Sequence, residues 1–247
     1  MTQLLHIQGL DLHYTGVRAL RGINLTLNAG DTLMITGPNG AGKSSLMKVI
    51  AGWIKPQAGC ITFGARKITG CKPETIAALG LSMVPEGRQV FGSMTVLENL
   101  RVATGMRGDK LAVAADLDYV LNLFPILRER AASQAGLLSG GQQQMLVIAR
   151  GLMTGPSLLA IDEPSLGLAP KITDQVYEAL LRLRRERKLT LLIVEQSTAR
   201  ALMTGGRMLM LREGQVVLEG DARALPAETL RQAYFGYAMR AGKPHSA

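Results

Sequence analysis

The sequence predicts an α/β fold built around a mainly parallel sheet, and three observations carry this prediction. Residues 158–161 and 189–194 form apolar runs, the second interrupted only by Thr190, that are typical of parallel strands buried on both faces. A segment with helical periodicity, residues 170–187, lies between them. A third apolar strand, residues 32–36, leads directly into a glycine-rich loop and a helix over residues 44–51.

An antiparallel layer and a helical insertion are expected to complete the domain. Residues 4–10 and 23–27 alternate between apolar and polar side chains, as half-buried strands do, and short strands are also expected at residues 61–63 and 81–84. Residues 92–154 have a mainly helical pattern, notably 111–124 and 142–153. A hairpin over residues 208–211 and 215–218, a short helix near 227–234 and a loose tail over 240–247 then end a single domain spanning residues 1–247.

The composition favours a reduced, cytoplasmic protein. Cys60 and Cys71 belong to no CxxC or Cys/His cluster, and the first nine residues lack the basic start and apolar block of a signal peptide. No apolar run approaches the roughly 20 residues that cross a bilayer. The formal charge of +9 fits nucleic-acid binding, an anionic membrane surface or simple solubility. The densest basic cluster, residues 182–188, ends a predicted helix whose dipole favours cations there.

A glycine-rich loop carries the strongest chemical signal in the sequence. Its glycines let the backbone curl so that amide groups point at phosphate oxygens, at the positive end of the following helix. Lys43 is expected to reach the β- and γ-phosphates of a nucleotide, and the Ser44 hydroxyl to hold Mg²⁺. A purely structural turn is the alternative, but Lys-Ser directly before a helix argues against it. The predicted nucleotide-binding residues of this segment are Gly37, Pro38, Asn39, Gly40, Ala41, Gly42, Lys43, Ser44 and Ser45.

Two acidic residues follow the predicted strand at residues 158–161. Asp162 lies at the carboxyl end of that strand, where a doubly wound sheet places ligand-contacting residues, so it can orient Mg²⁺ through water. Glu163 is the next residue. An Asp-Glu pair that merely starts a turn is commoner in general, but the preceding strand and Pro164 favour a catalytic pair.

A third motif, LSGGQ at residues 138–142, precedes the predicted helix at 142–153. The hydroxyl and amide groups of such a segment form an anion site at a helix end, and they also cap the helix. The glycine-rich loop, LSGGQ and the Asp-Glu pair, in this order, resemble the ATP-binding cassette (ABC) ATPases. This resemblance implies that each ATP binds between two chains. The residues of this chain that would face the γ-phosphate of ATP held by a partner are Ser139, Gly140, Gly141 and Gln142.

The resemblance also implies further roles. It implies an ABC-type nucleotide-binding domain, with a RecA-like parallel sheet, an antiparallel β layer and a helical insertion. Glu163 would position or deprotonate the water that attacks the γ-phosphate. Tyr14 lies where ABC ATPases place an aromatic ring against adenine, with core packing as the alternative for this ring.

Three positions depart from the usual ABC pattern. Glu86 stands in place of a glutamine, Gln196 in place of a histidine that contacts the γ-phosphate, and Ala169 in place of an aspartate. Glu86 suits Mg²⁺ or water and repels phosphate, whereas Gln196 can donate a hydrogen bond to phosphate but cannot become a cation. These departures leave a slow, degenerate site as the alternative to normal hydrolysis.

Residues 84–88, 162–170 and 194–196 together are similar to one of the two ATPase subunits of high-affinity branched-chain amino acid importers. This similarity runs from about residue 4 to residue 236. It implies a peripheral subunit on the cytoplasmic face of the inner membrane that uses ATP and Mg²⁺. Its expected partners are a second ABC ATPase, two integral membrane permeases and, indirectly, a periplasmic solute-binding protein. A heterodimer is expected and a homodimer stays open. Relatives that import other amino acids, amides or urea leave the substrate open.

Two other classes of function compete with transport. A soluble ABC ATPase acting on nucleic acid or ribosomes is supported mainly by the charge of +9, but the sequence holds none of the coiled-coil insertions, zinc modules or tandem cassettes common in such proteins. A P-loop GTPase or a small-molecule kinase predicts no LSGGQ, and the sequence has no Asn-Lys-x-Asp guanine-reading motif. No nucleic-acid partner is therefore expected. In the transporter, residues 88–94 are expected to contact a cytoplasmic helix of the membrane subunit.

Overall fold

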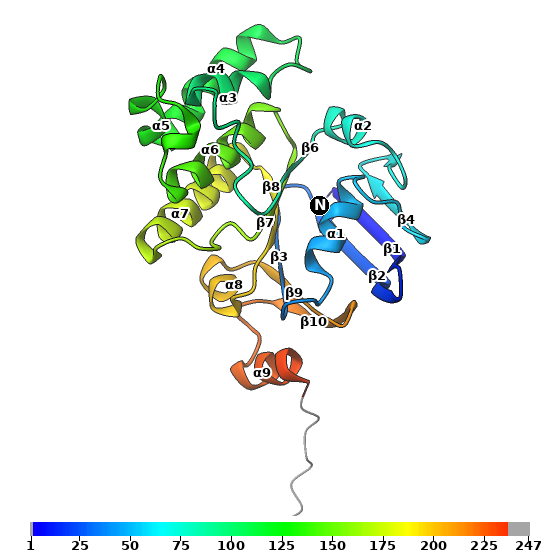
Figure 1. The fold of residues 1–247 in the computed structure, drawn as a ribbon. Helices are drawn as coiled ribbons and strands as arrows, with labels where there is room; N and C mark the ends of the chain where they lie inside the picture. The colour runs from blue at the N-terminus through cyan, green and yellow to red at the C-terminus, as the bar shows by residue number, and fades with distance from the viewer. Residues whose placement is uncertain (1, 237–247) are drawn as a thin grey trace, which may run out of the picture.

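A six-stranded sheet forms the centre of the molecule in the computed structural model, which describes residues 2–236 (Figure 1). Its strand order is β10-β9-β3-β8-β7-β6. All neighbouring pairs are parallel except β9 and β10, which form an antiparallel hairpin at one edge. The bounds are β3 (Thr32–Thr36), β6 (Leu81–Val84), β7 (Leu158–Asp162), β8 (Thr190–Val194), β9 (Arg207–Arg212) and β10 (Gln215–Asp221). The predicted parallel core is confirmed.

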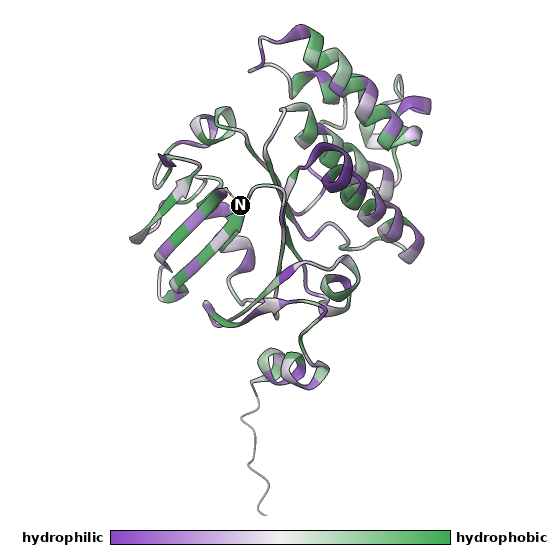
Figure 2. Ribbon diagram, turned by 180° about the vertical axis from the view of Figure 1, so that it is seen from behind, coloured by the Kyte–Doolittle hydropathy of each residue, from purple (hydrophilic) through white to green (hydrophobic). Residues whose placement is uncertain are grey.

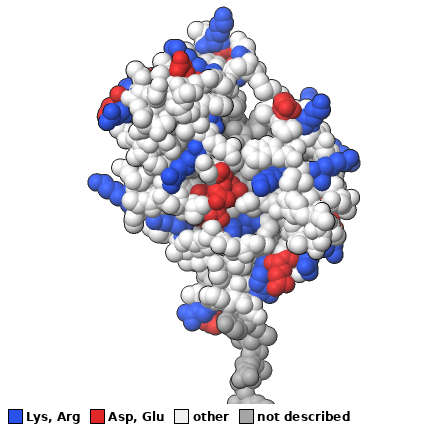
Figure 3. All heavy atoms as spheres, in the orientation of Figure 1, with Lys and Arg blue, Asp and Glu red and all other residues white. Residues whose placement is uncertain are grey.

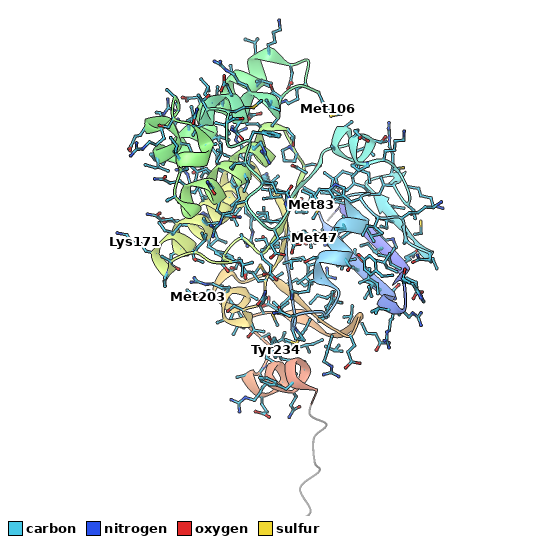
Figure 4. All side chains as sticks on the ribbon, in the orientation of Figure 1. Met47, Met83, Met106, Lys171, Met203 and Tyr234 are labelled. Atoms are coloured by element: carbon cyan, nitrogen blue, oxygen red, sulfur yellow. The ribbon has the colours of Figure 1, made fainter. Side chains whose placement is uncertain are left out.

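A second, antiparallel sheet lies beside the first, with the order β2-β1-β4-β5. Its strands are β1 (Gln3–Tyr14), β2 (Val17–Asn28), β4 (Ala58–Phe63) and β5 (Arg66–Lys67). Alternate residues of β1 and β2 are buried, as the alternating pattern requires, and they pack towards α1 (Lys43–Ile50) and one face of the central sheet. Met47 of α1 belongs to this core and the partly buried Met83 of β6 packs against it, and Figure 4 shows the two near each other at the middle of the molecule.

Helices α3 to α9 belong to a second core on the opposite face of the central sheet (Figure 1), whereas the short helix α2 (Pro73–Ala78) packs with α1 through Ile76. Between β6 and β7 the chain forms α3 (Val96–Val102), α4 (Lys110–Leu123), α5 (Pro125–Glu129), a 3-10 turn η1 (Ala135–Leu137) and α6 (Gly140–Met153). After β7 follow α7 (Pro170–Arg187), α8 (Thr198–Thr204) and α9 (Ala227–Phe235). In Figure 2 the strands of the central sheet are mostly hydrophobic, whereas the outer helices carry hydrophilic stretches.

Several elements differ from the sequence prediction. The first hairpin is longer than expected because bulges in β1 interrupt its alternation, and the strand continues past Gly9, whose φ is +57°. α6 begins at Gly140, two residues earlier than predicted. Two short helices were not predicted, α2 (Pro73–Ala78) and α8. The expected tail at residues 240–247 lies outside the described residues.

Surface charges are partly paired within the chain. Arg187, in the basic end of α7, pairs with Asp116 and stacks over the Tyr119 ring, and Arg182 pairs with Glu186. The last turn of α7 also carries Arg184 and Arg185, and the helix dipole favours positive charges at this end. Both cysteines are free thiols. None of the helices within residues 2–236 combines the length and apolar character that crossing a bilayer requires.

Candidate nucleotide site

The glycine-rich loop connects β3 to α1, and its backbone needs glycine at two points. Gly37 has φ +145° and Gly42 has φ +101°, a region that other residues rarely adopt. A Cβ atom at Gly37 would lie 2.1 Å from the Leu211 carbonyl oxygen, and one at Gly42 would lie 2.5 Å from the Ala19 carbonyl oxygen. Close packing against neighbouring backbone therefore fixes the loop at the amino end of α1, where amide groups can bind phosphate.

Lys43 lies inside this loop and is only 5% exposed. Its Nζ donates to the carbonyl oxygens of Gly37, at 2.8 Å, and Pro38, at 3.1 Å. Burial lowers the pKa of Lys43, and the neighbouring carboxylates, Glu163 foremost, oppose that effect. The ammonium group is thus held where phosphate oxygens bound by the loop would meet it.

Asp162 ends β7 and is 2% exposed. Ser44, in the first turn of α1, makes a side-chain hydrogen bond with it, but Asp162 Oδ1 is buried without a hydrogen-bond partner. Burial raises the pKa of Asp162 to about 6. A buried, unpaired carboxylate oxygen beside a serine hydroxyl fits an oxygen-binding cation such as Mg²⁺.

Glu163 lies between the glycine-rich loop and the end of β8. Its φ is +50°, which is uncommon for a residue with a side chain, and its N–H donates to the Val194 carbonyl oxygen at 2.9 Å. Glu163 Oε1 is 3.9 Å from Lys43 Nζ, and Glu163 Oε2 accepts a 2.7 Å hydrogen bond from Gln196 Nε2. Three segments far apart in the sequence therefore bring one carboxylate, one ammonium and one amide together.

Glu195, next to Gln196, is a third buried carboxylate, beside Asp162 and Glu163, and the sequence did not single it out. It is 3% exposed and accepts hydrogen bonds from the Tyr177 hydroxyl at 2.7 Å, the Ser165 hydroxyl at 3.0 Å and the Ser165 N–H at 3.2 Å. Burial raises the pKa of Tyr177, which is therefore a neutral donor. Glu195 thus ties the start of the 165–169 loop to the end of β8. The only sequence signal for it is an acid directly after an apolar strand.

Ser139 is the N-cap of α6, and it forms a capping box with Gln142. The Gln142 N–H donates to Ser139 Oγ at 3.4 Å, and the Ser139 N–H donates to Gln142 Oε1 at 3.0 Å. Gly141 packs against α7, because a Cβ atom there would lie 2.5 Å from Ile172 Cγ2. The structure places α6 and α1 on opposite faces of the central sheet (Figure 1), so residues 139–142 are not gathered with the glycine-rich loop.

Tyr14 and Glu86 lie at the margins of the site. The Tyr14 ring is 42% exposed, and its hydroxyl is 3.3 Å from Ser45 Oγ at the start of α1. This exposure argues against core packing of the ring. Glu86 is exposed, and its charge adds to the effect of burial in raising the pKa of Asp162 and opposes the effect of burial in lowering the pKa of Lys43. Figure 3 shows acidic side chains gathered at the centre of this face, with basic side chains on both sides.

Comparison with known proteins agrees with this geometry. Residues 20–166 match the family model described as ABC transporter. The chain is 39% identical to the high-affinity branched-chain amino acid transport ATP-binding protein BraG of Pseudomonas aeruginosa, over 94% of this chain and 100% of that protein. It is 35% identical to the probable branched-chain amino acid transport ATP-binding protein LivF of Archaeoglobus fulgidus, over 87% and 91%. A solved ATP-binding cassette of an ABC transporter, in its ADP conformation, superposes with a TM-score of 0.82 at 28% identity, covering 94% of each chain.

Proposed function

Because the chain belongs to the ABC transporter ATP-binding family and is a transport ATPase, we propose that the importer it powers carries branched-chain amino acids. Support comes from relatives named for this transport, with identities of 39% and 35%. A relative from Rhodopseudomonas palustris that is named for phosphonate import is 34% identical. Phosphonate import is therefore the competing hypothesis, and an uptake assay distinguishes the two substrate classes.

Hydrolysis is assigned to the cluster of Lys43, Glu163 and Gln196. The Lys43 ammonium would leave its carbonyl partners for the β- and γ-phosphate oxygens, which are stronger acceptors because they are charged. Glu163 would accept a proton from the attacking water, and the Gln196 amide would fix the orientation of that carboxylate. The observation that carries this proposal is Glu163 held between Gln196, at 2.7 Å, and Lys43, at 3.9 Å.

Mg²⁺ is assigned to Ser44 and Asp162. Within residues 2–236, no group of three His, Cys, Asp or Glu side chains could hold a metal ion by itself. Proteins commonly bind Mg²⁺ through one or two carboxylates together with substrate phosphates. When bound there, the ion would neutralise charge that develops on the phosphates. Asp162 would supply an oxygen ligand directly or through water, and exposed Glu86 would act only through a water shell.

We assign the exposed amino end of α6 to the interface with a partner subunit. Residues 139–142 lie away from the chain's own glycine-rich loop, so their amide groups would face ATP that a second ABC ATPase holds. The two ATPases would form a heterodimer beneath two permeases, on the cytoplasmic face of the membrane. A periplasmic solute-binding protein would deliver the solute to the permeases. Adenine would stack on Tyr14, whose ring is exposed beside α1.

Residues 88–94 are assigned to contact with a permease helix. Phe91 is 46% exposed and Met94 is 38% exposed, although Arg150 lies over the Phe91 ring at 4.8 Å. Phe91→Glu would place a charge in that contact. It should uncouple ATP hydrolysis from transport while nucleotide binding stays normal, and an unchanged coupling and unchanged membrane assembly would contradict the assignment.

Affinity purification of the chain from its native membrane, followed by identification of every co-purifying protein, tests the proposed assembly. We expect a second ABC ATPase, two permeases and a solute receptor. Uptake of radiolabelled leucine, isoleucine, valine and a phosphonate by cells with and without the chain tests the substrate. Loss of leucine, isoleucine and valine uptake is expected. Loss of phosphonate uptake alone, or co-purification with nucleic acid instead of permeases, would contradict the proposal.

A further inference from the structure

Arg88 connects three segments that lie far apart in the sequence: its own loop after β6, the loop after β7 and the amino end of α6. It belongs to the loop after β6, and its φ of +48° is uncommon for a residue with a side chain. Its Nη2 donates to the carbonyl oxygens of Leu166, at 3.1 Å, and Gly167, at 2.9 Å. Both acceptors belong to the loop that directly follows Glu163. The guanidinium group therefore holds the loop after β6 against the loop after β7.

The same guanidinium group lies against the first residue of α6. A Cβ atom at Gly140 would lie 2.2 Å from Arg88 Nη1 and 2.9 Å from Arg88 Cζ. Gly140 has an ordinary helical backbone, since its φ is not positive, so no backbone strain requires glycine at this position. The absence of a side chain at Gly140 is what admits the Arg88 guanidinium.

A second arginine holds the same loop from the other end of α6. Arg150 Nη2 donates to the Gln89 carbonyl oxygen at 2.5 Å, and its guanidinium group lies over the Phe91 ring. The loop after β6 is thus also fixed to α6 at the residues that directly follow Arg88. This leaves Arg88 little freedom to move independently of α6 and the loop after β7.

We propose that Arg88 is a positioning residue that holds residues 139–142 and residues 165–169 in one fixed arrangement. This inference rests on the proposed function, in which residues 139–142 face ATP bound by the partner subunit, whereas residues 165–169 directly follow Glu163 of this chain's own site. Because Arg88 contacts both segments at once, its loss would let them move separately. Hydrolysis of the partner's ATP would then slow, even though no atom of Arg88 needs to touch that nucleotide.

The purified isolated chain tests the geometry without any partner. Gly140→Ala should displace the Arg88 guanidinium, and Arg88→Ala should remove it, so each variant loses the same hydrogen bonds. We expect each to lower Tm by about 5 °C, a shift appropriate to the loss of both hydrogen bonds in a chain of this size. The double variant should lose no more than one single variant does. Fully additive losses would overturn the contact between Arg88 and Gly140.

The assembled transporter tests the role. Glu163→Gln silences the site of this chain, so the remaining turnover reports the partner's site. In that background, Arg88→Met should lower kcat about tenfold while KM for ATP stays within about twofold, and Arg88→Lys should restore part of the loss. Arg185→Met, an exposed arginine on α7, is the matched control and should leave kcat unchanged. An unchanged kcat in Arg88→Met, or an equal loss in the control, would overturn the proposal.

The experiments distinguish failure of the proposed heterodimer from failure of the role proposed for Arg88. If no second ABC ATPase co-purifies with the wild-type chain, the assignment of a heterodimer fails, and the Tm comparison still tests the Arg88 contacts. ATP binding by the isolated Arg88→Met chain, measured with a fluorescent ATP analogue, should equal that of the wild-type chain. A loss of this binding would make Arg88 a nucleotide ligand of its own site and would overturn the positioning role.

Discussion

Removing the Tyr177 hydroxyl tests whether the buried Glu195 carboxylate is charged and held by its three donors. Tyr177→Phe keeps the ring, which is 6% exposed, and its contact with Arg200, whose guanidinium carbon is 5.9 Å from the ring centre. The variant removes only the 2.7 Å hydrogen bond to Glu195 Oε1. Glu195 would then keep two donors, both from Ser165, while remaining 3% exposed.

The expected loss of stability follows from the charge of the acceptor. A hydrogen bond to a charged group contributes about 1.5–3 kcal/mol, compared with about 1 kcal/mol for a bond between neutral groups. Tyr177→Phe should therefore lower the free energy of unfolding by about 2 kcal/mol. In a Glu195→Gln background, where the acceptor is neutral, the same change should cost about 1 kcal/mol.

Urea unfolding of the four chains, followed by circular dichroism, measures this double-mutant cycle. The difference between the two backgrounds is the coupling between the hydroxyl and the carboxylate charge. A cost below about 0.5 kcal/mol for Tyr177→Phe would refute the reasoning, because that is the usual effect of a surface substitution. Equal costs in both backgrounds would also refute it.

Three further predictions concern the nucleotide site. Glu163→Gln should lower turnover at this site by about 10²–10⁴-fold with ATP affinity within about threefold, measured by single-turnover hydrolysis and ATP binding; a loss below tenfold would exclude Glu163 as general base. Because burial raises the pKa of Asp162 to about 6 from 3.8, the folded chain holds this proton more tightly than the unfolded chain does. Stability without Mg²⁺ should therefore fall by about 3 kcal/mol as pH rises from about 4 to about 6. Asp162→Asn should remove this dependence of the unfolding free energy on pH, measured by urea unfolding in the presence of EDTA. The same pH dependence in both chains would contradict the prediction. Tyr14→Ala should weaken ATP binding by about 1–3 kcal/mol in a titration, whereas Tyr14→Phe should retain it; equal affinities in all three chains would exclude stacking.

The parallel core was predictable because its signals are local. Strand β6 and helix α7 begin and end at the predicted residues, since Pro85 stops the strand and Pro170 starts the helix. The first hairpin was predicted too short because bulges break the two-residue alternation of β1. Helices α2 and α8 have only six and seven residues, too few for a helical period to stand out.

Contacts between distant loops were not predictable from local patterns. Glu195 is held by Tyr177 from α7 and by Ser165 from the loop after β7. Neither residue belongs to a sequence motif that indicates a contact with Glu195. The contacts of Arg88 with residues 166 and 167 also depend on how β6 and β7 are placed side by side. The glycine-rich loop differs, because its spacing alone specifies the chemistry that its backbone can perform.

The central claim, that this chain drives an amino acid importer through the Lys43 and Glu163 site, is tested most directly by ATP hydrolysis in the purified, reconstituted assembly. The rate should rise when a leucine-loaded solute receptor is added, and Lys43→Ala should abolish that rise while the assembly stays intact. A rate that leucine-loaded receptor does not change, or a Lys43→Ala assembly that responds as the wild type does, would contradict the claim.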